Sequence, residues 1–143
     1  MGNGRMIEVS KRLAPWRNAV AAATRAVMRG RQPFGGPVAI TLEFVMPRPV
    51  SLPKRMPTPP AIKRPDVDKL ARSCLDAIVT GAAIVDDSQA IDLRATKRIA
   101  EIGERPGVVI EITDLSSHTN HDQKMPQRGR GTAITATVEV EQP

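Results

Sequence analysis

The segment from Pro47 to Pro65 limits what this chain can fold into more than any other part of its sequence. It contains seven prolines, five cations and no acidic residue. Each proline removes a backbone donor and pushes the preceding residue towards an extended conformation, which excludes a helix or a central strand. Structureless segments of this length inside a compact domain are usually functional or disordered. Because this one leads directly into an acidic cluster, we interpret it as a functional basic loop.

Hydrophobic periodicity on either side of the loop predicts one α+β domain, with two helices and a mostly antiparallel sheet of three or more strands. We expect helices at residues 15–29 and 66–79 and strands at residues 5–9, 38–46, 89–99 and 108–113, the last two forming an antiparallel pair. Residues 1–115 would form this domain. Residues 116–143 would form a polar, disordered tail, in which the strand propensity of residues 132–140 has no clear partner.

The charges divide at the end of the loop. Residues 1–65 hold twelve basic and two acidic residues, whereas residues 66–143 hold nine basic and thirteen acidic residues. The basic half could bind phosphates and the acidic half could bind a metal ion. Because only three residues are aromatic, contact with a nucleic-acid backbone is favoured over stacking of bases. A basic domain whose acidic patch binds a protein partner remains an alternative.

No apolar run is long enough to cross a bilayer, and the first residues lack the apolar stretch of a signal peptide. We therefore expect a cytoplasmic protein with no membrane partner. Its single cysteine, Cys74, lies on the apolar stripe of the second helix, where a small buried hydrophobic residue is expected. His118 and His121 lie in the polar tail and are poorly spaced for a metal site.

Several carboxylates surround the second helix. Asp66 and Asp68 stand at its start, and Asp87, with Asp86 beside it, stands before the strand at residues 89–99. Hard oxygen ligands of this kind suit Mg²⁺, which could activate water for phosphodiester hydrolysis. Taken singly, Asp66 could instead be an ordinary helix cap and Asp86-Asp87 a turn.

Lys97 falls on the otherwise apolar side of that strand, where a cation costs free energy unless it has a partner. A carboxylate cluster or a phosphate could supply the partner. The alternative is a lysine whose ammonium group extends to solvent near the strand end.

The runs Arg64-Pro-Asp66-Val-Asp68-Lys-Leu-Ala-Arg72-Ser-Cys-Leu-Asp76-Ala-Ile and Asp86-Asp87-Ser-Gln89-Ala-Ile, followed by Lys97, resemble the RusA family of Holliday-junction resolvases. Members are small, dimeric, Mg²⁺-dependent endonucleases common in phages and prophages. The resemblance implies cleavage of branched DNA such as a four-way junction, by a homodimer. It implies Asp66, Asp68 and Asp87 as metal-binding catalytic residues, with Asp86 as a further metal candidate and Asp76 in a structural position.

The roles expected for the basic residues follow from their charge and their positions around this motif. Arg72 and Lys97 would offset phosphate charge at the catalytic site. The DNA backbone would be held by cations of the basic loop and of the first helical turn, which are Lys54, Arg55, Lys63, Arg64 and Lys69.

The chain departs from the family pattern in two places. Arg72 occupies a position where members commonly carry a catalytic lysine, and arginine is effectively never deprotonated. Members also open with a strand and a Pro- and Ser-containing segment, so we expect this chain to lack that strand. These departures leave a non-catalytic DNA-binding relative as the alternative function.

Overall fold

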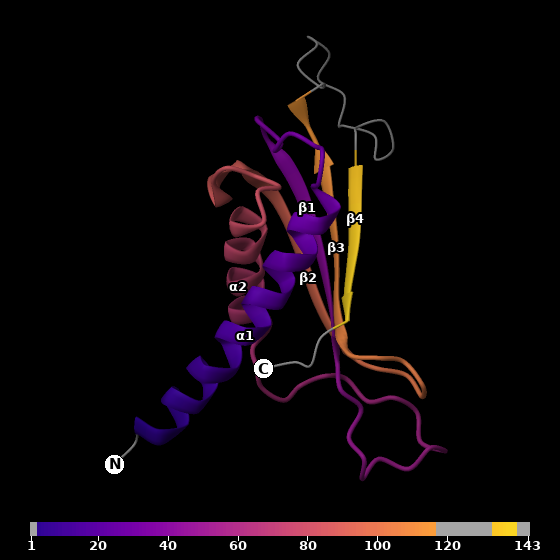
Figure 1. Cartoon of the computed structure of the whole chain (residues 1–143). Coiled ribbons are helices and arrows are strands. Elements are labelled where there is room, and N and C mark those ends of the chain that lie inside the picture. The colour runs from indigo at the N-terminus through magenta and orange to yellow at the C-terminus, as the bar shows by residue number, and fades with distance from the viewer. Residues whose placement is uncertain (1–2, 117–132, 140–143) are drawn as a thin grey trace.

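The computed structural model of the chain describes residues 3–116 and 133–139, with side chains from residue 14 onwards. Its elements, in chain order, are α1 (Asn3–Val27), β1 (Val38–Met46), α2 (Val67–Thr80), the short 3-10 helix η1 (Asp87–Gln89), β2 (Ala90–Ile99), β3 (Gly107–Asp114) and β4 (Ala133–Glu139). The two α-helices lie side by side against the sheet, and the basic loop extends beyond the ends of the strands (Figure 1). The expected α+β class, with its mostly antiparallel sheet, is confirmed.

β1 occupies an inner position in a sheet of strand order β2-β1-β3-β4. It pairs parallel with β2 and antiparallel with β3, so the prediction that β3 pairs with β2 is wrong. The physical reason is the apolar character of β1, in which Val38, Ile40, Leu42 and Phe44 are at most 1% exposed. A strand buried in this way is favoured between two neighbours that satisfy both of its edges.

The parallel pair makes a βαβ unit of β1, α2 and β2, because parallel neighbours need a crossover connection. α2 therefore begins at the edge of the sheet where β1 and β2 end. In Figure 1 the chain enters α2 from the side of the basic loop and arches over the opposite edge of the sheet before β2 begins. This arrangement decides where each candidate carboxylate lies.

Alternate residues of three neighbouring strands face the helices and form the core. Ile40 lies opposite Ile112, which lies opposite Ile134, and all three are buried. From the helices, Trp16 packs beside Phe44 with ring centroids 6.1 Å apart. The sequence predicts a buried stripe on α2 of Val67, Leu70, Ala71, Cys74 and Ile78. The structure buries Leu70, Ala71, Cys74, Ala77 and Ile78, whereas Val67, in the first turn, is 37% exposed.

The predicted strand at residues 5–9 is wrong, because these residues belong to α1. No described strand is left to pair with this segment, whereas a helix satisfies its backbone groups locally. The helix also continues through Pro15, which had been expected to open it. Near the end of α1, Gly30 has a φ of +77°, a left-handed conformation suited to a residue without a Cβ.

β4 pairs antiparallel with β3 along its whole length. Its residues alternate between exposed and buried, with Ile134, Ala136 and Val138 inside. Residues 133–139 are therefore part of the sheet and not of a disordered tail. The rest of that expected tail, including His118 and His121, lies outside the described residues, apart from Ser116. Among the described helices, none is both long and apolar enough to cross a bilayer.

Candidate active site

Asp66 and Asp68 lie at the start of α2, at the edge of the sheet where β1 and β2 end. In α/β units the crevice beyond the carboxyl ends of parallel strands is the usual place for a ligand. Asp66 holds the N-cap position of α2 and has extended backbone angles, but its side chain makes no capping hydrogen bond. The Asp66 carboxylate therefore does not act as a helix cap, and its side chain remains available for another role.

Both carboxylates at the start of α2 are exposed and largely unengaged. The Lys69 ammonium lies 4.0 Å from Asp66 Oδ2, at the outer limit of an ion pair. The Asp68 side chain makes no hydrogen bond or ion pair with any described residue. Two acceptor groups are thus free on one helical turn, where the helix dipole favours negative charge and a bound cation would offset the repulsion between them.

The Lys97 side chain has partners that the sequence did not indicate. Its Nζ donates hydrogen bonds of 2.7 Å to the carbonyl oxygen of Lys63 and 2.9 Å to that of Pro65. An ammonium group has three N–H donors, so a third remains for another acceptor. Lys97 thus anchors the last residues of the basic loop directly before Asp66. Its position opposite Phe44 also confirms that it lies on the apolar, helix-facing side of β2.

The basic loop is fixed at its other end by Arg48. The Arg48 guanidinium donates to Thr58 Oγ1 at 2.8 Å, and this hydroxyl donates to Glu101 at 2.7 Å. Longer bonds join Arg48 to the carbonyl oxygens of Met56 and Ala100. Arg48 is therefore a structural residue. The four cations predicted to bind DNA in this loop, Lys54, Arg55, Lys63 and Arg64, are exposed and make no side-chain ion pair with described residues.

Arg72 lies one helical turn after Asp68 and is exposed. Residues four apart share a face of a helix, so Arg72, Asp68 and the following Asp76 lie along one side of α2. Asp76 Oδ2 lies 3.7 Å from Arg17 Nη1 of α1. That contact joins the two helices and agrees with a structural role for Asp76.

Asp86 is more firmly engaged in the local structure than Asp87. Asp86 caps η1 by accepting a 2.9 Å hydrogen bond from the backbone N–H of Ser88. Hydrogen bonds from Ser88, from its side chain and its backbone, lower the pKa of Asp86 and keep it ionised. Asp87, in the first turn of η1, is exposed. Of the two carboxylates, Asp87 is the one that is freer to bind a metal ion.

Gln89 is a positioning residue to which the sequence analysis assigned no role. Its Oε1 accepts from the backbone N–H groups of Val85 and Asp86 at 2.7 and 3.1 Å. Its Nε2 donates to the carbonyl oxygens of Phe34 and Gly36 at 2.8 and 2.9 Å. With Asp86 it completes a capping box, for which the Asp-x-x-Gln spacing was the available signal. Gln89 fixes the turn that carries Asp87.

The expected convergence of Asp66, Asp68 and Asp87 does not occur within one chain. At 1.5 Å per residue, the 14 residues of α2 place its two ends about 20 Å apart. Asp66 and Asp68 lie at one end, and the turn with Asp87 follows the other. The sheet register agrees, because Ala90 pairs with Val38 and Lys97 with Phe44, levels about 20 Å apart along β1.

Among the described residues, no group of three or more His, Cys, Asp or Glu side chains is placed to hold a metal ion. Asp66 and Asp68 alone still fit Mg²⁺, which takes one or two protein carboxylates and completes its sphere with water and phosphate. Both carboxylates have free oxygen atoms, and neither side chain makes a hydrogen bond or ion pair shorter than 4.0 Å with a described residue.

Cys74 is buried on α2, as the sequence predicts. Burial raises the pKa of its thiol to about 12, so the reactive thiolate is not populated near neutral pH. Cys74 is therefore a packing residue, and nucleophilic chemistry at this residue is excluded.

A family model described as endodeoxyribonuclease RusA matches residues 2–113. The match contains the basic loop, all of α2 and the turn with Asp87, and it ends inside β3, so β4 lies beyond it. No curated protein matches the chain at a significant level.

Proposed function

Because this chain belongs to the endodeoxyribonuclease RusA family, we propose that it is a Mg²⁺-dependent endonuclease of branched DNA that resolves four-way Holliday junctions in recombination and repair. The observation that carries this proposal is the pair of unengaged carboxylates, Asp66 and Asp68, directly after a basic loop without acidic residues. A site of this kind would hold a cation next to the phosphodiester bond that is cleaved.

Each residue of the site has a distinct part in this proposal. Asp66 and Asp68 would hold Mg²⁺, which, when bound, activates water and neutralises phosphate charge. Arg72 would offset charge on the phosphate oxygens without transferring a proton. Lys97 holds the Lys63 and Pro65 carbonyls and so orients Asp66. The exposed cations of the loop, Lys54, Arg55, Lys63 and Arg64, with Lys69 on α2, would bind the DNA backbone.

We also propose a homodimer in which Asp87 completes the metal site of the other copy. Asp66 and Asp68 of one subunit would then meet Asp87 of the partner subunit, about 20 Å from Asp87 of their own chain. An isologous dimer forms each such contact twice. Two equivalent sites would result, which suits the cutting of opposing strands of a symmetric four-way junction.

The edge of β2 supports this dimer. β2 is an outer strand of the described sheet, and Ile91 and Leu93 on it are 68% and 43% exposed. If two β2 strands pair antiparallel about a two-fold axis, the start of one lies opposite the end of the other. Asp87 precedes the start of β2, and Lys97 with its bound Pro65 carbonyl lies near the end. This pairing therefore brings Asp87 of each copy towards Asp66 of the other.

The alternative function is a DNA-binding relative without nuclease activity. Arg72 favours it, because a guanidinium cannot replace a lysine that transfers a proton. The two functions share the basic loop and differ only in Mg²⁺-dependent cleavage.

A nicking assay separates them. The full-length protein is incubated with a synthetic four-way junction, the matching linear duplex and a single strand, each with Mg²⁺ or with EDTA. We expect paired nicks in the junction only, and only with Mg²⁺. Tight binding of the junction without any nick would instead support the non-catalytic alternative.

A further inference from the structure

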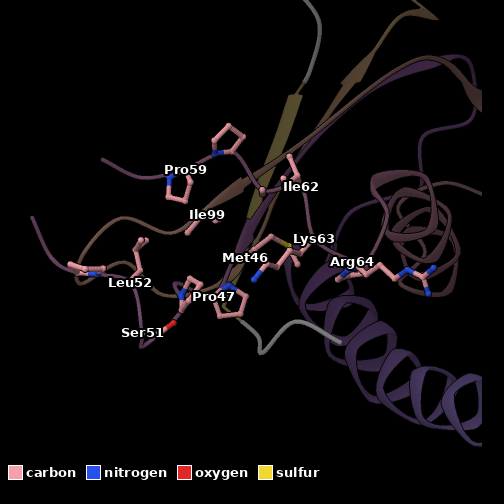
Figure 2. Close-up of a pocket in the computed structure, with 14 residues that line it drawn as sticks. Met46, Pro47, Ser51, Leu52, Pro59, Ile62, Lys63, Arg64 and Ile99 are labelled. Atoms are coloured by element: carbon pink, nitrogen blue, oxygen red, sulfur yellow. The ribbon is translucent and has the colours of Figure 1, made fainter. Parts of the chain in front are cut away.

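A hollow in the basic loop, next to the candidate active site, has the properties of a binding site for a small apolar group. It has a volume of about 630 Å³, within the range of about 300–1,000 Å³ typical of small-molecule sites. Its floor comes from Met46 and Ile99, at the ends of β1 and β2, and its walls come from Leu52, Ile62 and the loop prolines. Figure 2 shows these side chains around the hollow, with Arg64 extending away from it towards the helices.

The hollow is built on a fixed frame. Arg48 holds the first part of the loop to Thr58 and to the carbonyl oxygen of Ala100, which follows β2. Lys97 holds its last residues through the carbonyl oxygens of Lys63 and Pro65. A site fixed at both ends loses little entropy when it binds a ligand.

The charges around the hollow point to the chemistry of its occupant. Lys63 and Arg64 contribute to its lining, no acidic residue does in the described part of the chain, and the loop that forms it has none. Directly beyond Pro65 lies Asp66, where the proposed function places the scissile phosphate. An apolar cavity with cations at its border fits a flat ring with apolar faces that is attached to a phosphate. A nucleotide with an unpaired base has both parts.

We propose that this hollow binds one unpaired nucleobase of the branched DNA, next to the strand that is cut. The inference rests on the proposed function and adds to it a contact at the branch point, where unstacking a base costs least. Since none of the described residues that line the hollow is aromatic, the base packs against proline rings and aliphatic side chains, and Lys63 and Arg64 bind the adjoining phosphates.

The chain offers a matched pair of variants for a test. Ile62 and Val50 are apolar residues of the same loop, 88% and 103% exposed, but only Ile62 lines the hollow. Ile62→Gln removes an apolar wall without changing the charge. Val50→Gln makes the same chemical change outside the hollow.

The measurement uses 2-aminopurine, a fluorescent base, placed singly at each nucleotide around the branch point of a four-way junction, and also in the middle of one arm. Fluorescence and affinity are recorded in EDTA, so that no cleavage occurs. We expect the full-length protein to change the fluorescence at one branch position and not in the arm. Ile62→Gln abolishes that change and weakens junction binding about fivefold, the loss expected from one apolar contact. Val50→Gln leaves both unchanged.

Junction binding by the wild-type protein without a fluorescence change at any branch position would overturn the inference. So would an Ile62→Gln variant that behaves as wild type. Unaltered fluorescence with a weakened dimer in Ile62→Gln would assign the hollow to a second copy of the chain and also overturn it. Cleavage with Mg²⁺ in the same samples reports on the proposed function separately. A fluorescence change without cleavage supports the base-binding hollow and rejects the nuclease. Cleavage without the fluorescence change supports the nuclease and rejects the base-binding hollow.

Discussion

Lys97 Nζ lies 2.9 Å from the carbonyl oxygen of Pro65, the residue before Asp66. This cation on the apolar face of β2 thus fixes the start of α2. Asp66 owes its position to a residue more than 30 positions later in the chain, on β2.

Lys97→Met should disturb the site by releasing the end of the basic loop. Two carbonyl oxygens lose a charged donor, which we expect to lower the free energy of unfolding by about 1–3 kcal/mol. Junction cleavage should fall more than junction binding, because Asp66 moves while the loop cations remain. Urea unfolding and a nicking assay measure the two effects. The control is Lys69→Met, because the Lys69 ammonium is exposed and lies 4.0 Å from Asp66 Oδ2. An equal effect of both variants on stability would contradict the anchoring role of Lys97.

The double change Lys54→Gln with Arg55→Gln should weaken binding of the four-way junction and reduce its salt dependence. If each cation contacts one phosphate, the slope of log K against log salt should become shallower by about 1.8. The control is Arg29→Gln with Arg31→Gln, which removes the same charge from exposed residues before β1. Fluorescence anisotropy at several salt concentrations gives the slopes. The same slope for both pairs would show that net charge, and not the loop, determines binding.

Glu104 predicts a specific dependence of stability on pH. Two hydrogen bonds from Arg98, of 2.6 and 2.7 Å, lower the pKa of Glu104 to about 2 from its ordinary value of 4.5. A lowered pKa in the folded state adds stability above pH 4.5 that is lost as the pH falls towards 2. Wild type should therefore exceed Glu104→Gln in unfolding free energy at pH 7, and the difference should shrink at pH 3.

Urea titrations at both pH values measure this difference. Glu111→Gln is the control, because Glu111 is exposed and makes no ion pair with a described residue. A difference between wild type and Glu104→Gln that does not change with pH would reject the ion pair with Arg98.

Gly107→Ala tests the pairing of β4 with β3. A Cβ at Gly107 would overlap the carbonyl oxygen of Val138, across the two strands. We expect a loss of about 1–3 kcal/mol in unfolding free energy from this overpacking. Gly35→Ala is the control, since its Cβ would meet no atom within 4 Å. Equal thermal stability of the two variants would mean that β4 does not pair with β3 in this register.

Local patterns predicted much of the fold. The alternation of β1 and the apolar stripe of α2 appear directly in the sequence, because each depends on residues close together in the chain. The register and order of the strands do not, since they depend on contacts between distant segments. β3 was therefore assigned to the wrong neighbour, and β4, whose alternation has meaning only beside β3, had no partner.

The sequence proposes residues for the candidate site but does not predict how they are arranged. Asp66, Asp68 and Asp87 were selected by type and spacing, and nothing in the spacing fixed their distance. That distance follows from the parallel pairing of β1 with β2, which places the two ends of α2 at opposite edges of the sheet. Lys97 was singled out by its position on an apolar face, but its partners are backbone carbonyls, which carry no sequence signal.

The carboxylates themselves can be tested one at a time. Asp68→Asn and Asp87→Asn should each abolish Mg²⁺-dependent nicking of a four-way junction, while binding in EDTA stays within a few fold. Asp76→Asn is the matched control, because Asp76 lies on the same helix and contacts Arg17. Wild-type nicking by either of the first two variants would remove that residue from the site.

Mixing the two inactive variants tests the central claim most directly, namely that two copies of the chain share each catalytic site. Asp68→Asn and Asp87→Asn subunits are unfolded together, refolded, and assayed for nicking of a labelled four-way junction. In a mixed dimer with shared sites, one site carries both substitutions and the other carries neither. The mixture should therefore recover nicking to about one quarter of the wild-type level, given random pairing and one intact site in each mixed dimer. If the mixture stays as inactive as the separate variants, although mixed dimers form, the shared site is contradicted.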